Sequence, residues 1–172
     1  AWEHHRYLAE GAAYDEAGTR SGTIVGNLSY QPGQGGGLAF ALDGDGDYVD
    51  LGGWAPNGEW TVAAWVQPTA VPASGRVAIA GGDAGAADWS IGIQDGNYGA
   101  FYKAGIFVNS GIAAGVGVWT HLAASLTGNT LKVYIDGELK SSQPIGTVYV
   151  PTTSGARIGN SAYNNGNYFT GL

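Results

Sequence analysis

The sequence contains no cysteine among its 172 residues. It can therefore form no disulfide, no thiolate metal site and no cysteine nucleophile, and it carries no signal of its redox compartment. Charged residues are also scarce, at 12% of the chain, and they leave a formal net charge of −7. Because an acidic chain lacks the attraction that nucleic acids and anionic membranes exert on basic proteins, we expect neither as a partner.

Long hydrophobic runs are missing as well. No apolar stretch approaches the roughly 18 residues that suggest a membrane span, and the first residues, "AWEHHRYLAE", lack the charged-then-apolar order of a signal peptide. The sequence therefore predicts no membrane insertion, and any targeting segment lies outside these residues.

Glycine, in contrast, is abundant, with 31 residues spread between apolar runs without a fixed period. This distribution is typical of many tight turns between short strands and not of a collagen or low-complexity chain. The hydrophobic content of 44% is enough to fill one core. We expect residues 1–172 to form a single domain.

Alternation of apolar and polar residues predicts β-strands. In "WTVAAWV", Trp60 and Val62 fall on the face opposite Thr61 and Trp65, which indicates a strand with one face on a core. No stretch shows a convincing helical period, and the weak candidate at 4–18 is interrupted by Gly11. Strands are predicted within residues 36–42, 47–52, 59–68, 76–82, 88–94, 98–104, 120–127, 131–137 and 156–161.

Turn residues support an all-β sandwich or barrel. "LTGNTLKV" has Thr127, Gly128 and Asn129 where a short hairpin connection is needed, and Asp136-Gly137 provides a second two-residue turn. The pattern by itself does not decide between sandwich and barrel.

Five segments spaced along the chain favour a sandwich over a barrel. They are "DEAG" at 15–18, "SGTIVGNLSY" followed by "GGGLAFALDGDGDYVDLG", "EWTVAAWVQP", "VWTHLAASLTGNTLKVYIDGELK" and "ARIGNSAYNNGNYFTGL". In order and spacing the sequence resembles laminin G-like domains of the concanavalin A-like lectin/glucanase superfamily. The resemblance implies an all-β concanavalin A-like jelly-roll sandwich of two antiparallel sheets.

The sequence departs from the family pattern at two places. It has "FALDG" where the family has Phe-Asp-Gly, so either Phe40 or Leu42 takes the aromatic position. The family pattern also continues with a strand of the type Ile-Asp-Glu-hydrophobic, whereas these residues stop at Leu172. We therefore expect the domain to lack its final strand and a neighbouring strand edge to be open to pairing with another chain.

The acidic turn "DGDGD" offers three carboxylates, Asp43, Asp45 and Asp47, as calcium ligands. It is not an EF-hand loop, because Tyr48 and Trp54 stand where that loop needs Gly and Glu. From spacing alone, a solvated β-turn is the alternative. The resemblance implies a structural calcium ion at this edge of the sandwich.

No catalytic residues are predicted. The superfamily's glucanases use a Glu-x-Asp-x-x-Glu strand, and this sequence has no such motif. Asp136 and Glu138 lie in a predicted turn, where solvated carboxylates are the simpler interpretation, and His121 in "WTHLAAS" is interpreted as a packing residue. His4 and His5 are adjacent near one end of the sequence and suggest no site.

Aromatic and amide side chains in two loops suit a neutral glycan, because rings stack on sugar faces while amides and carboxylates bind hydroxyls. The alternative is that these aromatics cap the core. The first set is Asp83, Asp88, Trp89 and Tyr98, with Gln94, Asp95 and Asn97 in the turn before Tyr98; the second is Tyr163, Asn164, Asn165, Asn167 and Tyr168.

Together these features predict a non-catalytic carbohydrate-binding module of a larger secreted or cell-surface protein, with calcium as a stabilising ion. A protein-binding adhesion module is the main alternative. A glycoside hydrolase or polysaccharide lyase of the same fold, and a structural spacer, are further alternatives. The expected partner is a glycan or glycoconjugate, and the expected location is extracellular.

Overall fold

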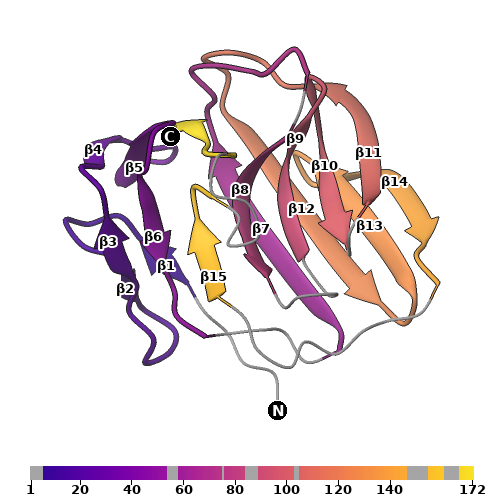
Figure 1. Cartoon of the computed structure of the whole chain (residues 1–172), viewed down its shortest axis with the longest axis horizontal. Coiled ribbons are helices and arrows are strands. Elements are labelled where there is room, and N and C mark those ends of the chain that lie inside the picture. The colour runs from indigo at the N-terminus through magenta and orange to yellow at the C-terminus, as the bar shows by residue number, and fades with distance from the viewer. Residues whose placement is uncertain are drawn as a thin grey trace.

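The computed structural model describes residues 6–53, 58–74, 76–83, 89–102, 105–146, 155–160 and 167–172 (Figure 1). These residues form sixteen β-strands and no helix. They accordingly include no helix with the length and apolar character needed to cross a membrane. The predicted all-β class is confirmed.

The strands form four antiparallel groups. The largest sheet has the order β11 (Ile106–Ala113), β10 (Asn97–Tyr102), β9 (Trp89–Gln94), β8 (Arg76–Asp83), β15 (Gly155–Ile158), β6 (Tyr48–Asp50) and β3 (Thr23–Val25). A second sheet contains β14 (Glu138–Pro144), β13 (Thr130–Ile135), β12 (Thr120–Thr127) and β7 (Trp60–Val66). The third contains β16 (Thr170–Gly171), β5 (Leu38–Asp43) and β4 (Ser29–Pro32), and β1 (Tyr7–Leu8) pairs with β2 (Tyr14–Asp15).

The two larger sheets pack face to face as a sandwich, with β9, β10 and β11 against β12 and β13 (Figure 1). One contact between the layers joins Trp60 of β7 to Trp89 of β9, whose ring centroids lie 5.7 Å apart. Apolar side chains from both layers share a single core, and burying them away from water is the main favourable contribution to folding. The core includes Ile91, Ile93, Val108, Leu122, Leu126, Leu131 and Val133, each 1% exposed or less.

The predicted alternation along β7 is confirmed. Trp60 and Val66 are buried in the core, whereas Trp65 is 48% exposed on the opposite face. Both predicted hairpins are also present, since Thr127 pairs with Thr130 and Ile135 pairs with Glu138.

Asp-Gly dipeptides form two of the hairpin turns. Asp136 and Asp95 have φ values of 51° and 49°, and each is followed by a glycine that also has positive φ. Asp tolerates this left-handed conformation better than most residues do, and two successive positive φ values match the twist of the flanking strands. The sequence therefore determines these connections locally.

Two long strands were not predicted. β14 has both faces largely exposed, so it lacks the alternation that marks a half-buried strand. β11 turns Ser110 inward, where its hydroxyl donates to the carbonyl of Tyr98 at 2.7 Å, and a polar inward position weakens the apolar pattern. The weak helical pattern near the N-terminus is also resolved, because its described part forms β1 and β2.

Asp15, the first residue of the "DEAG" motif, organises the N-terminal segment. It is only 8% exposed, and its carboxylate accepts hydrogen bonds from the backbone amides of Arg6, Ala17, Gly18 and Arg20 at 3.0 to 3.2 Å. A short irregular segment has few backbone carbonyls in position to accept from its own amides, and the Asp15 carboxylate takes that place. The motif therefore has a structural role.

We expect Asp15→Ala to lower the free energy of unfolding by at least about 2 kcal/mol, because the change removes a buried charged acceptor that four backbone amides share. Urea unfolding measures this difference. Asp45→Ala, which removes an exposed carboxylate, is the matched control and should change stability by less than about 0.5 kcal/mol. Equal effects of the two substitutions would contradict the role assigned to Asp15.

Candidate functional site

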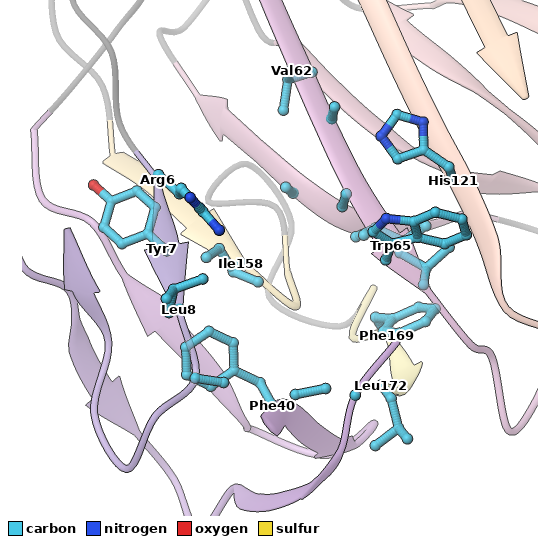
Figure 2. A pocket seen from close by; sticks show the side chains of 18 of the residues that line it. Arg6, Tyr7, Leu8, Phe40, Val62, Trp65, His121, Ile158, Phe169 and Leu172 are labelled. Carbon is cyan, nitrogen blue, oxygen red and sulfur yellow. The ribbon is translucent and has the colours of Figure 1, made fainter. Parts of the chain in front are cut away.

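The outer face of the four-stranded sheet carries an exposed aromatic pair. Trp65 projects from β7 and pairs in register with His121 of β12. Their ring centroids lie 5.2 Å apart with the ring planes tilted by 58°, and Figure 2 shows the two rings beside each other. Since the alternation of β7 directs Trp65 away from the core, this large ring offers its surface to solvent.

Asp136 lies on the other side of His121. Its backbone amide donates to the His121 carbonyl at 2.8 Å, and its Oδ1 accepts from the His121 amide at 2.9 Å. These two bonds fix the position of the β13–β14 turn against β12. Trp65, His121, Asp136 and Gly137 together line an open hollow of about 320 Å³.

The next row of the same face has a floor of small side chains. Ala63 of β7 pairs with Ala123 of β12, and Ala123 pairs with Tyr134 of β13. Because alanine has only a methyl side chain, the floor is lower than Trp65 on one side and Tyr134 on the other. The row beyond it is polar and consists of Thr61, Ser125 and Lys132.

This face combines a flat apolar ring with hydrogen-bonding groups at its edges. Such a combination suits a ligand that has apolar faces and many hydroxyl groups. The hydrogen bond and charge of Lys140, whose Nζ lies 2.6 Å from Glu138 Oε2, lower the pKa of Glu138, so this exposed carboxylate is ionised near neutral pH.

The acidic turn separates its three carboxylates. Asp43 and Asp45 are exposed, and Asp43 Oδ1 accepts from the Asp45 amide at 2.8 Å. Asp47 is 2% exposed, and its Oδ1 accepts from the Asn27 amide at 2.7 Å. Nowhere in the described part of the chain do three or more acidic or histidine side chains gather in a way that could hold a metal ion.

Asp43, Asp45 and Asp47 therefore do not fit a common metal centre as they lie. Their observed contacts are those of a turn in which short acidic side chains bind nearby backbone amides. A calcium ion at this turn would need most of its oxygen ligands from other groups.

The predicted sugar-binding loops agree less well with the structure. Trp89 and Tyr98 are only 4% and 1% exposed, and both belong to the core between the sheets. A ring without an exposed face cannot stack on a sugar, so we correct the assignment of these two residues from binding to packing. Their alternation with Ile91 and Ile93 explains the burial, because all four side chains point inward across the β9–β10 hairpin.

Of the other predicted residues, Asn167 and Tyr168 are half-buried just before β16. Gln94, Asp95 and Asn97 bond within their own turn, where the Asn97 Nδ2 donates to the Asp95 carbonyl at 3.2 Å. The backbone of Asp83 ends β8. The side chain of Asp83, together with Asp88, Tyr163, Asn164, Asn165, His4 and His5, lies outside the described residues.

Sequence reasoning missed Trp65, His121 and Tyr134 as site residues. A usable signal was present for Trp65, because a tryptophan on the polar face of an alternating strand has no core to fill. His121 and Tyr134 lack such a signal, since their neighbourhood depends on how β7, β12 and β13 align.

Comparison with known families gives one match. A laminin G family model, described as "Concanavalin A-like lectin/glucanases superfamily", matches residues 43–172. No curated protein sequence matches the chain.

Several solved structures share the fold. Domain 4 of AbnA, a GH43 extracellular arabinanase from Geobacillus stearothermophilus in complex with arabinotriose, is similar with a TM-score of 0.82 and 23% identity, over 98% of this chain and 86% of that one. The receptor binding domain of botulinum neurotoxin D is similar with a TM-score of 0.66 and 18% identity, over 95% and 45%. A heptameric SAP-like pentraxin from Limulus polyphemus gives 0.58 and 13%, over 76% and 70%.

Burial of Tyr98 leads to a pH prediction. Burial raises the pKa of the Tyr98 hydroxyl above its ordinary value, while the nearby Thr120 hydroxyl acts in the opposite direction. A raised pKa in the folded state means that the unfolded chain loses this proton first, so stability should fall as pH rises from about 10 toward the folded-state pKa. Tyr98→Phe should reduce this alkaline loss.

Urea unfolding at a series of pH values from 8 upward measures the effect. Tyr14→Phe, at a tyrosine that is 60% exposed, is the matched control. An alkaline slope that is the same in Tyr98→Phe and in the unmodified protein would contradict the assignment of Tyr98.

Proposed function

The chain belongs to the laminin G-like group of the concanavalin A-like lectin/glucanases superfamily, and we propose that it is a non-catalytic carbohydrate-binding module. The main support is the exposed ring of Trp65 beside His121 and Asp136, above a floor formed by alanines. Concave or shallow sites that pair an aromatic surface with a few convergent polar groups are typical of ligand binding.

In this proposal a sugar ring stacks on Trp65, and its hydroxyls bind the polar rim. The Asp136 carboxylate accepts hydrogen bonds, the His121 imidazole donates or accepts, and the Tyr134 hydroxyl reaches the far side of the alanine floor. Small side chains at Ala63 and Ala123 allow a second sugar unit to lie along the sheet. The face is thus suited to a chain of sugars.

Charge favours a neutral ligand. The protein has a formal net charge of −7, which repels acidic polysaccharides over distances comparable to the Debye length. Lys132 adds a positive charge to this face, but one lysine does not reverse the net charge of the molecule. Neutral plant or microbial glycans are therefore the proposed class.

Arabino-oligosaccharides are the first ligands to test. The structure of the arabinanase domain contains arabinotriose, and its similarity to this chain is the reason for the choice. An identity of 23% supports the shared fold alone, so the sugar is a proposal.

Two expectations from the family resemblance also stay predictions, namely bound calcium and an extracellular location. Calorimetric titration of Ca²⁺ into chelator-treated protein tests the first. Binding heat that disappears in Asp43→Ala would support a calcium site at the acidic turn. A titration without heat would leave the turn with the backbone-capping role that its contacts describe.

We expect Trp65→Ala to weaken glycan binding by at least about tenfold, because loss of one stacked aromatic contact removes on the order of 1–2 kcal/mol. Isothermal titration with arabinotriose and with a panel of neutral oligosaccharides measures the affinity. Trp65→Phe should retain part of it, since a smaller ring still stacks.

Tyr14→Ala is the control, because it removes another exposed aromatic ring. Tyr14 belongs to β2, which is not part of the four-stranded sheet. Binding that is unaffected by Trp65→Ala but reduced by Asn167→Ala or Tyr168→Ala would move the site to the loop before β16. Binding of no glycan by any folded variant would favour the protein-binding alternative.

A further inference from the structure

The outer face of the four-stranded sheet continues past the Trp65–His121 pair to the residue just before β12. Thr120, the first residue of β12, is 6% exposed and belongs to the inner face. Because side chains of a strand alternate between its two faces, the residues on either side of Thr120 point outward. One of them is His121. The other is Trp119, which is partly exposed and lines a common hollow with His121 and Trp65.

The strand register places Trp119 diagonally across from Trp65. His121 of β12 pairs with Trp65 of β7. Since the two strands are antiparallel, the residue two positions before His121 falls opposite the residue two positions after Trp65, so Trp119 lies opposite Gln67. Diagonal neighbours of this kind have Cα atoms roughly 7–8 Å apart, within reach of large aromatic side chains. The two indole rings therefore belong to one surface.

Gln67 holds the connection that leads into Trp119. Its Nε2 donates to the Gly117 carbonyl at 3.0 Å, and the Gly117 amide donates to the Pro68 carbonyl at 2.8 Å. These bonds tie the β11–β12 connection to the end of β7. Trp119 is thus positioned before a ligand arrives, which lowers the entropy lost on binding. The Gln67 Oε1 can in addition accept a hydrogen bond from a sugar hydroxyl.

The β11–β12 connection is apolar although it lies at the surface. Residues 111–119, "GIAAGVGVW", include no polar side chain. Val116 and Val118 are 61% and 55% exposed. Apolar side chains that gather at the surface commonly mark a binding site, and Val118 directly precedes Trp119. The connection therefore extends the apolar surface of the ring.

This part of the surface is also uncharged. The sequence contains no acidic or basic residue between Lys103 and Lys132. An anionic lipid or an acidic polysaccharide would need basic groups here. A neutral ligand with apolar faces needs none, so the surroundings of Trp119 suit the same class of ligand as Trp65 does.

Three rows of outward side chains follow one another along β7 and β12. Successive rows are two residues apart, which is about 7 Å along a strand. The first row carries an indole ring on β12, the second carries one on β7, and the third is the alanine floor. A chain of sugars can follow all three rows, whereas a single sugar reaches only one of them. The rows are Gln67 with Trp119, Trp65 with His121, and Ala63 with Ala123.

We propose that Trp119 is a second sugar-stacking residue, and that the ligand is a linear neutral oligosaccharide of at least three units. The chain runs from Trp119 over Trp65 to the alanine floor. This inference rests on the proposed glycan binding at Trp65. It adds that the site recognises an extended stretch of a glycan and not one terminal sugar.

The test compares ligands of increasing length on the same protein. Isothermal titration is carried out with arabinose, arabinobiose and arabinotriose, and with glucose, cellobiose and cellotriose as a second series. In the series that binds, affinity should rise at least about tenfold from the single sugar to the trisaccharide, because additional units stack and bury apolar surface.

Substitutions separate the two rings. Trp119→Ala should weaken trisaccharide binding by at least about tenfold and change single-sugar binding by less than about threefold, whereas Trp65→Ala should weaken both. Trp119→Phe should retain part of the trisaccharide affinity, since a smaller ring still stacks. Tyr14→Ala is the control, and urea unfolding establishes that each variant is folded.

Tryptophan indole signals in NMR spectra test the contact on the unmodified protein, so the test does not depend on the folding of any variant. The Nε1–H signals of Trp65 and Trp119 should both shift when the trisaccharide binds. The single sugar should shift the Trp65 signal alone. Signals of Trp60 and Trp89, which are buried in the core, should stay in place and serve as the internal control.

Three results would overturn this inference and leave the proposed function standing. The first is trisaccharide binding that Trp65→Ala weakens and Trp119→Ala does not. The second is equal affinity for the single sugar and the trisaccharide. The third is a bound trisaccharide that leaves the Trp119 signal unshifted. If no sugar of either series binds the unmodified protein, the proposed function and this inference are both contradicted.

Discussion

The alternation of side chains along β7 is the constraint on which the core and the candidate site both depend. Its even-numbered residues, Trp60 to Val66, pack into the core, and its odd-numbered residues form the outer face with Trp65. The register of β7 against β12 then sets which side chains of the two strands lie opposite each other on each face. A register slip of one residue would exchange the two faces, so the hydrophobic pattern holds all of these features in place together.

Aspartate has one recurring use in this glycine-rich chain. Asp15, Asp47, Asp50 and Asp136 each accept hydrogen bonds from backbone amides, and Asp43 does the same within the acidic turn. A fold with sixteen described strands has many irregular connections, and their amides need acceptors that a regular ladder would otherwise provide. The position of these aspartates near turns therefore has a structural explanation in the backbone amides that they bind.

The fold could be predicted from the sequence because strand alternation and turn residues are local patterns. β7, β12 and β13 alternate clearly, and Asp-Gly turns define their hairpins. β14 escaped prediction because an edge strand with two exposed faces has no apolar period. The candidate site on the outer face could not be predicted in the same way. Trp65, His121 and Asp136 come from two strands and a turn whose alignment is set by long-range pairing, and no spacing in the sequence encodes that alignment.

Trp89 and Tyr98 were wrongly predicted to be exposed binding residues. Their loop-like surroundings of glycine, aspartate and asparagine indicated an exposed site, but β9 and β10 form a central hairpin with inward rings.

The position of β15 and β16 has a consequence for how the chain folds. β15 lies between β6 and β8, and β16 pairs with β5, so strands that come late in this domain must join strands that come much earlier in its sequence. Contacts between residues that are distant in sequence have a high entropic cost of loop closure, and domains rich in them fold slowly. While the chain emerges from the ribosome, one edge each of β5, β6 and β8 stays unpaired until β15 and β16 have been made. The native sheet order can therefore be completed only after residues 155–171 have left the ribosome.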